Sequence, residues 1–234
     1  LGFIFGEWQG ELYRDPFLRF IQGSPRENGG QYASVNHSVN YLESHDNYTL
    51  GDFIRIGLHK NSSDDVIVDI NKHALITPEE LKIHKLAALM LLTSQGTVMM
   101  AQGQEWGRSK VIASTNVPDP NIGKMDHNSY EKDNETNWLN WNHKEMNSLL
   151  VDYYRDLIKL RKKYPALRQA KLDDIEFDLP KNKHSFGYFI HPDGEDALFV
   201  CVNGDRVKNA KFIVPEGNWW ILFAPDSPEL KKSF

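Results

Sequence analysis

A histidine and an aspartate stand side by side, as His45-Asp46, at the end of a segment (38–42) that is predicted to form a strand. The carboxylate can stabilise developing positive charge, and the imidazole can donate a hydrogen bond to a bound sugar. Glycoside hydrolysis passes through an oxocarbenium-like transition state, which needs nearby negative charge. Such short pairs are also common where the aspartate only caps the following segment. The pair alone therefore leaves both roles open.

A second group of candidate residues follows the next predicted strand (97–100). Residues 102–106 come directly after that strand, and a long loop rich in polar and aromatic residues continues over 107–141. Trp106 and Trp138 could stack on sugar rings, because apolar sugar faces fit flat aromatic rings; ordinary core packing is the alternative for each. Ligands of parallel β/α folds lie at the carboxyl ends of the strands. We therefore expect both groups to open on the same face.

Two predicted helices hold these strand ends in place. The first begins after Thr77, which can form a capping box with Glu80 before an apolar helical repeat. The second runs over 144–163 and stops before Pro165. Later helical signals are absent, and short strand-like runs separated by turns follow at 185–191, 197–203, 211–214 and 219–223. The pattern predicts an α/β fold with a β/α domain over 1–168 and a small antiparallel β domain over 169–234.

Composition narrows the classes of function. The 234 residues carry a net charge of -5 without a basic cluster, which argues against nucleic acid as a partner. No apolar run reaches the roughly 20 residues needed to span a bilayer. We find no phosphate loop, dinucleotide fingerprint or zinc-type ligand spacing, so no cofactor or metal is expected. The single cysteine, Cys201, is expected to be a small buried residue.

The residues around His45-Asp46 (39–50) resemble the fourth conserved region of glycoside hydrolase family 13, the α-amylase superfamily. The resemblance is to its pullulanases, isoamylases and bacterial glycogen debranching enzymes. Further segments resemble the same group in the same order along the chain, and together they cover 1 to about 168. They are Glu7-Trp8-Gln9-Gly10 with Tyr13-Arg14-Asp15 and Arg19-Phe20; residues 103–110; Asn128-Ser129-Tyr130 with Asp133 and 137–141; and residues 154–161 with 165–168.

The resemblance implies the C-terminal part of a (β/α)8 barrel followed by a β-sandwich. It also implies hydrolysis of α-glucosidic bonds with retained configuration, with an α-glucan as partner and an α-1,6 preference. On this interpretation Asp46 is the transition-state stabiliser and His45 binds the sugar at the cleaved bond. The resemblance also assigns Asn128, Tyr130 and Asp133 to the substrate cleft.

Two carboxylates of the family's mechanism have no matching motif here. A retaining mechanism needs a nucleophile and a general acid about 5–5.5 Å apart. No segment resembles the nucleophile motif. Glu7 could be the acid, but its segment fits a later motif of the family better. We therefore expect this chain alone to be inactive, with the missing barrel half in the same parent chain. A non-catalytic carbohydrate-binding or scaffold protein and a transglycosylase of the same superfamily are the alternatives.

Overall fold

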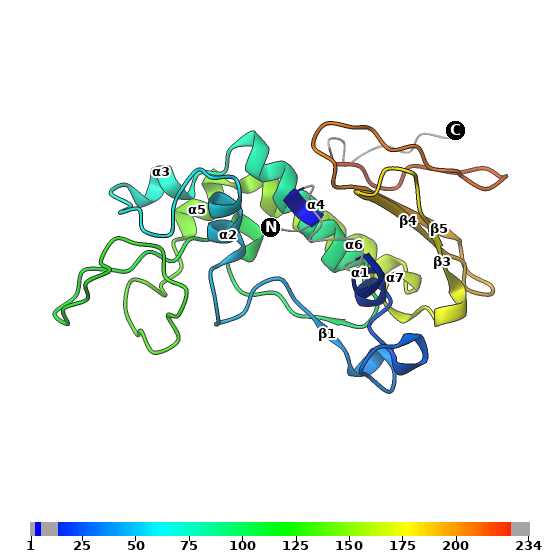
Figure 1. The fold of residues 1–234 in the computed structure, drawn as a ribbon, viewed down its shortest axis with the longest axis horizontal. Coiled ribbons are helices and arrows are strands. Elements are labelled where there is room, and N and C mark those ends of the chain that lie inside the picture. The colour runs from blue at the N-terminus through cyan, green and yellow to red at the C-terminus, as the bar shows by residue number, and fades with distance from the viewer. Residues whose placement is uncertain (1–2, 6–13, 226–234) are drawn as a thin grey trace. The chain divides into compact units, whose positions relative to one another are not determined.

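The computed structural model describes residues 3–5 and 14–225 (Figure 1). Its α-helices are α1 (Arg14–Ile21), α2 (Leu50–Gly57), α3 (Ile70–Ala74), α4 (Pro78–Thr93), α5 (Trp141–Met146), α6 (Ser148–Lys163) and α7 (Ala166–Gln169). Its strands are β1 (Val39–Asn40), β2 (Thr97–Val98), β3 (Ile175–Asp178), β4 (Ser185–Ile190) and β5 (Leu198–Asn203). In the part described, no helix is both long and apolar enough to cross a membrane.

Packing divides the chain into two compact units. The first unit comprises Leu1–Asn40, Leu86–Met99 and Arg155–Phe234, and the second comprises Tyr41–Lys85 and Met100–Tyr154. The halves of α4 and of α6 therefore belong to different units. The sequence boundary between residues 168 and 169 stays a prediction.

The first unit holds two small sheets. Strands β1 and β2 pair in parallel, with Val39 opposite Thr97, and the chain between them includes α2, α3 and α4. Strands β3, β4 and β5 form an antiparallel sheet in that order. Side chains alternate between the faces of a strand, and alternate residues of β4 enter the hydrophobic core. These buried residues are Phe186, Tyr188 and Ile190, and they share a cluster with Ile21 of α1 and Leu167 of α7.

A buried arginine closes the end of α4 in the same unit. The guanidinium of Arg161 on α6 donates to the backbone oxygens of Leu92, Ser94 and Leu167 at 2.9, 2.7 and 2.6 Å. It also donates to the oxygen of Gly96 at 2.7 Å. The last carbonyls of a helix have no partner within the helix, so Arg161 supplies donors that the helix itself lacks.

Local capping explains where the helices of the second unit begin. Thr77 and Glu80 form the predicted capping box: the Glu80 carboxylate accepts the Thr77 N–H at 2.6 Å, and the Thr77 hydroxyl accepts the Glu80 N–H at 3.4 Å. The Thr49 hydroxyl accepts the Asp52 N–H at the start of α2. Asp69 does the same for two N–H groups of α3. Short polar side chains at these positions satisfy N–H groups that the first helical turn leaves unpaired.

Asn147 separates α5 from α6, where the sequence predicts one helix over 144–163. Its side-chain oxygen accepts the Ile76 N–H at 3.0 Å. Its amide nitrogen donates to the oxygens of Ala74 and Trp106 at 2.8 and 2.9 Å. The buried Asn147 side chain thus joins its own backbone to the 74–76 segment and to residue 106, at the point where the helix is interrupted.

Several expectations about strands are wrong in detail. Residues 211–214 and 219–223 do not form strands, and β3 was not expected. One physical reason is visible at Ile213, whose N–H donates to the Asp178 carboxylate at 3.2 Å instead of to a neighbouring strand. Cys201, expected to be buried, is exposed on β5, and the core position is occupied by Val202 beside it.

Candidate functional site

His45 and Asp46 lie in the second unit, on a loop over residues 43–50. We call this segment the 43–50 loop. The His45 Nε2 and Asp46 Oδ2 atoms are 3.4 Å apart, and the two side chains are 71% and 65% exposed. Asn47, next along the loop, adopts a left-handed conformation with φ of 63°. The Asp46 N–H donates to the Ser44 hydroxyl at 3.3 Å. The sequence-predicted pair is therefore adjacent, open to solvent and free of a capping bond made by the Asp46 carboxylate among the described residues.

The base of the 43–50 loop is closed by side chains. Glu43 Oε2 accepts the Leu50 N–H at 2.9 Å, so the carboxylate at one end of the loop binds the backbone at the other end. Thr49 donates its hydroxyl hydrogen to the Arg108 oxygen at 2.7 Å. Burial raises the pKa of Glu43 to about 7, while the Leu50 N–H and the nearby cations Arg108 and Lys110 act against this rise. The loop is thus anchored at its base and exposed at its tip.

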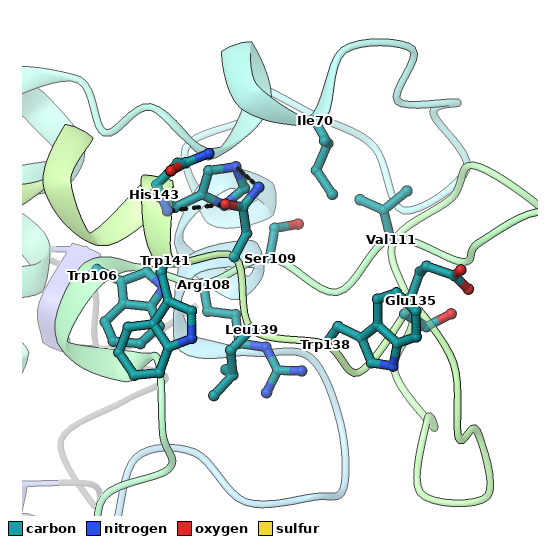
Figure 2. Close-up of a pocket in the computed structure, with 13 residues that line it drawn as sticks. Ile70, Trp106, Arg108, Ser109, Val111, Glu135, Trp138, Leu139, Trp141 and His143 are labelled. Atoms are coloured by element: carbon teal, nitrogen blue, oxygen red, sulfur yellow. Dashed lines mark hydrogen bonds between the residues drawn. The ribbon is translucent and has the colours of Figure 1, made fainter.

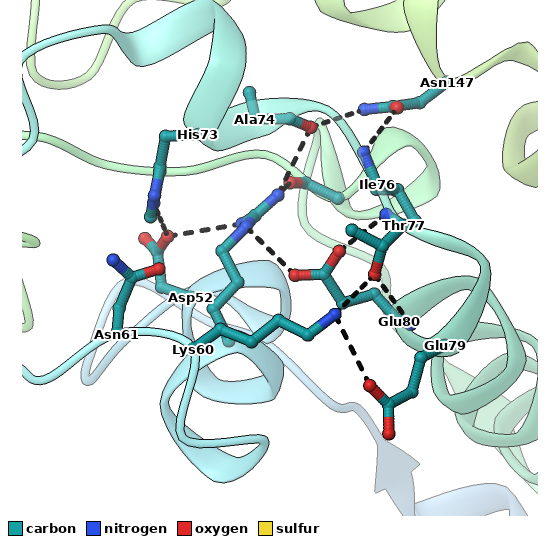
Figure 3. A network of polar contacts seen from close by, with 12 residues as sticks. Asp52, Lys60, Asn61, His73, Ala74, Ile76, Thr77, Glu79, Glu80 and Asn147 are labelled. Atoms are coloured by element: carbon teal, nitrogen blue, oxygen red, sulfur yellow. Dashed lines mark hydrogen bonds and ion pairs between the residues drawn. The ribbon is translucent and has the colours of Figure 1, made fainter.

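A buried network of charged groups joins α2 to the first turn of α4 (Figure 3). Arg55 Nη1 is 3.4 Å from Asp52 Oδ1, and Arg55 Nε is 3.8 Å from Glu80 Oε1. The same guanidinium donates to the backbone oxygens of Ala74 and Gly107, each at 3.2 Å. A buried cation is tolerated because it has both opposite charges and hydrogen-bond acceptors around it.

Asp52 is the centre of this network and is fully buried. His73 Nε2 lies 3.4 Å from Asp52 Oδ1, and the Lys110 N–H donates to Asp52 Oδ2 at 2.9 Å. Burial by itself would favour the neutral acid, but the bonds from His73 and Lys110 and the Arg55 charge outweigh it and lower the pKa of Asp52. The network ties α2 to the 107–110 segment, next to the 43–50 loop.

A pocket of about 420 Å³ opens among residues 106–143 (Figure 2). Trp138 and Trp141 are 64% and 55% exposed, whereas Trp106 is buried and lies 5.4 Å from the Trp141 ring, centroid to centroid. The Arg108 side chain also lines the pocket, and it donates to the Asn137 oxygen at 2.6 Å. Exposed indole rings beside a cation and amides can bind an amphipathic ligand such as a sugar chain.

The long loop is held by Asn137. Its amide nitrogen donates to the oxygens of Ser129 and Lys132, both at 2.6 Å, and its side-chain oxygen accepts the Ser129 hydroxyl at 2.8 Å. Lys132 in turn pairs with the buried Asp126 at 2.7 Å. These bonds fix the segment that carries the remaining candidates, Asn128, Tyr130 and Asp133, which are all exposed.

The candidate residues fall into two neighbouring groups within the second unit. Trp106 and Trp138 line the pocket, whereas its lining does not include His45, Asp46, Asn128, Tyr130 or Asp133. The Tyr48 ring of the 43–50 loop lies 5.7 Å from the ring of His127, which precedes Asn128. The tip of the 43–50 loop is thus linked to the 128–133 segment through Tyr48. Glu7 lies outside the described residues.

Sequence reasoning gave no role to Glu43, Arg55 or Arg108. Glu43 lies inside the matched motif, and the Thr49-x-x-Asp52 spacing is a helix-start signal that could have revealed α2. No local pattern indicates that Arg55 pairs with Glu80, which is far along the chain. Within the described residues, no three His, Cys, Asp or Glu side chains gather in a way that could hold a metal ion.

The chain is similar in sequence to several debranching enzymes. No protein-family profile matches it. It is 31% identical over 141 residues to a pullulanase of Bacillus subtilis, covering 60% of this chain and 16% of that protein. It is 26% identical over 257 aligned residues to a glycogen debranching enzyme of Pectobacterium carotovorum, covering 93% of this chain and 37% of that protein. An isoamylase is among the other matches.

A solved structure supports the same relation. A variant of the pullulanase from Paenibacillus barengoltzii, complexed with maltotetraose, is 30% identical with a TM-score of 0.64, over 87% of this chain and 28% of that chain. The chain therefore spans well under two thirds of the relatives it matches. These matches confirm the predicted similarity to the debranching members of glycoside hydrolase family 13. They also confirm a mixed α/β chain of pullulanase-like fold with a small antiparallel sheet.

Proposed function

We propose that this relative of the pullulanases and glycogen debranching enzymes supplies one carboxylate and part of the substrate cleft of a retaining α-glucan hydrolase. The observation that carries the proposal is the His45-Asp46 pair. It is exposed at the tip of a loop whose base is closed by Glu43, within a segment that resembles the family's fourth conserved region. An α-1,6 bond is the proposed target, because the relatives are debranching enzymes.

The finer architecture belongs to the same proposal. A (β/α)8 barrel over 1–168 would contain the parallel pair β1 and β2 with helices between them along the chain. A β-sandwich over 169–234 would contain the antiparallel sheet β3, β4 and β5. Helical connections between parallel strands and hairpin connections between antiparallel ones are the usual arrangements, which supports the division.

In the proposed reaction Asp46 stabilises the positive charge that develops on the cleaved sugar. Its carboxylate is solvent-exposed and next to His45 Nε2, so a sugar ring could reach both groups. Negative charge placed where positive charge develops lowers the barrier more than it strengthens ground-state binding. The nucleophile and the acid would come from the parent chain, since no segment here resembles the nucleophile motif and the Glu7 segment fits a later motif of the family better.

The glucan chain is proposed to extend along the exposed aromatic residues of the second unit. Trp138 offers an exposed ring, and the buried Trp106 supports Trp141 from behind. The exposed residues Asn128, Tyr130 and Asp133 lie on the segment linked to the 43–50 loop through Tyr48. An aromatic platform with polar groups along its edge matches the apolar faces and hydroxyl rims of a glucan.

Asp46→Asn tests the catalytic role in the protein expressed from the complete gene. The rate at which reducing ends are released from pullulan should fall by several orders of magnitude, because the transition state loses the negative charge that stabilises it. The unfolding curve should stay unchanged. Asp64→Asn is the matched control, since its side chain is 83% exposed at the surface of the same unit. An Asp46→Asn enzyme of normal activity would refute the role.

A non-catalytic α-glucan binder is the second candidate, and the pocket favours it because its aromatic lining does not include Asp46. Calorimetry of the present chain with maltotetraose separates the two functions. Binding that is lost in Trp138→Ala and unchanged in Asp46→Asn, without hydrolysis by the complete protein, would favour the binder. The enzyme proposal requires hydrolysis that depends on Asp46.

A further inference from the structure

Glu43 is the buried charged group closest in sequence to the proposed catalytic pair. Only 3% of the residue is exposed, and Oε2 accepts the Leu50 N–H at 2.9 Å. Leu50 is the first residue of α2, and N–H groups in a first helical turn have no partner within the helix. Glu43 thus satisfies a helix donor from the opposite end of the loop that bears His45 and Asp46.

Other contacts do not replace this bond. The Thr49 hydroxyl accepts the Asp52 N–H at 3.0 Å and donates to Arg108, so it is already used in both directions. The second oxygen of Glu43, Oε1, is buried and has no hydrogen-bond partner among the described residues. A carboxyl group used only for filling space could be replaced by an apolar one at lower cost. The position therefore requires an acceptor.

The surroundings of Glu43 have opposing effects on the pKa of its carboxyl group. Burial favours the neutral acid, whereas the Leu50 N–H, Arg108 and Lys110 favour the carboxylate, and Asp52 opposes it. Tyr154, whose pKa is raised by burial, also interacts with Glu43 electrostatically. The outcome is a pKa of about 7. Because burial outweighs the favourable contacts, the closed loop is most stable with a neutral Glu43, so ionisation near neutrality should weaken the hold on the loop.

We propose that Glu43 is a positioning residue that holds the loop bearing His45 and Asp46, and that ionisation of its buried carboxyl group loosens this hold. The role of the loop rests on the proposed function, whereas the bond and its titration do not. In a glucan hydrolase of this design, the placement of the stabilising carboxylate would depend on pH through a residue that never touches the sugar.

Nuclear magnetic resonance of the full chain tests the bond directly. The Leu50 amide proton should titrate with a midpoint near pH 7, moving downfield as Glu43 ionises. Glu43→Gln keeps an acceptor oxygen and should abolish that titration while the remaining spectrum is preserved. Glu145→Gln, an exposed change in the same unit, should leave the titration intact. A Leu50 amide in the wild-type chain that does not titrate between pH 5 and 9 would overturn the proposal.

Loop order and glucan binding give the second measurement. In Glu43→Ala the amides of His45 and Asp46 should exchange with solvent at least tenfold faster. In the wild type their protection, corrected for the chemical exchange rate, should fall as the pH rises from about 5 to about 7. Unchanged protection in Glu43→Ala would also overturn the proposal. Failure of maltotetraose to bind the wild type, with the Leu50 titration intact, would instead count against the proposed function alone.

Discussion

The two units of this chain are stabilised by different kinds of interior. The first unit packs an apolar cluster in which Phe186, Tyr188 and Ile190 of β4 are almost fully covered. The second unit also buries a network of opposite charges, with Asp52, Arg55 and Glu80 all less than 5% exposed. Apolar burial stabilises without regard to pH, whereas a buried ion pair costs desolvation and depends on every partner being present.

The second unit needs buried polar groups because it contains long loops outside regular secondary structure. The second unit carries the candidate site on long loops, whose backbone groups need partners outside regular structure. Polar side chains provide those partners: the buried Arg55 binds two backbone oxygens, and the partly buried Asn137 binds two more. The comparison teaches that the loops of the site are fixed by polar side chains, and that their stability should respond to charge and pH where the first unit does not.

Removing Arg55 should have the largest effect. Arg55→Met leaves Asp52 and Glu80 as buried carboxylates without their cation, so the second unit should lose about 3–5 kcal/mol. Amide exchange of α2 measures this loss, which should shrink in acid as the carboxyl groups become neutral. Arg161→Met in the first unit is the control: its partners are carbonyls, so its loss should not shrink in acid. Equal pH dependence of both losses would break the contrast.

Two buried groups of the second unit should oppose each other as the pH changes. Burial lowers the pKa of His84 to about 3, and burial raises that of Glu43 to about 7. Folding therefore keeps His84 neutral below its ordinary pKa of 6.5, which makes stability fall as the pH drops from 6.5 towards 3. Folding retains a proton on Glu43 between 4.5 and 7, which makes stability rise as the pH drops through that range.

The two slopes should nearly cancel between about pH 4.5 and 6.5. Glu43→Gln should uncover the His84 slope, a loss of about 1.4 kcal/mol for each unit that the pH falls. Amide exchange in the second unit at several pH values measures the slope. His84→Gln should reverse its sign, and a flat profile in Glu43→Gln would contradict the assignment.

A smaller effect is expected in the first unit. Ile190→Val removes one methyl group from a residue with no exposed surface, so stability should fall by about 0.5–1.5 kcal/mol. Urea unfolding at pH 5 and pH 8 measures the cost, which should be the same at both values. Ile213→Val, at a side chain that is 80% exposed, should change little. A pH-dependent cost would show that the two units unfold as one.

The smallest effect is expected for a surface ion pair of the second unit. Lys124 Nζ lies 3.2 Å from Asp64, but the Asp64 side chain is 83% exposed. Lys124→Ala should cost less than about 1 kcal/mol, because solvent screens the pair. Thermal unfolding in low and high salt measures the difference. A larger loss would mean that exposed ion pairs also contribute substantially to the stability of this unit.

Local patterns predicted the elements that local forces determine. The Thr77 and Glu80 capping box and the helix it begins are present, and so are the apolar runs that became β4 and β5. The family resemblance came from short motifs in order along the chain, and the relatives confirm it. These features could be predicted because their partners lie within a few residues of one another.

The rest depends on partners that are distant in sequence. The helix predicted over 144–163 is interrupted because Asn147 binds backbone groups near residues 74–76 and 106, which no periodicity reveals. The Asp52, Arg55 and Glu80 network is equally invisible to spacing, since each residue alone suits an exposed helix face.

Asn147 has a further consequence, which concerns tolerance to mutation. At this position the side chain must accept one hydrogen bond and donate two, all toward backbone atoms. Aspartate has the same shape but would turn an oxygen toward two carbonyls, and leucine would leave three backbone groups unsatisfied. Leu149, two residues on, is 69% exposed and free of such demands. Substitution should therefore be almost forbidden at Asn147 and nearly free at Leu149, and a mutational scan should show this contrast between the two positions.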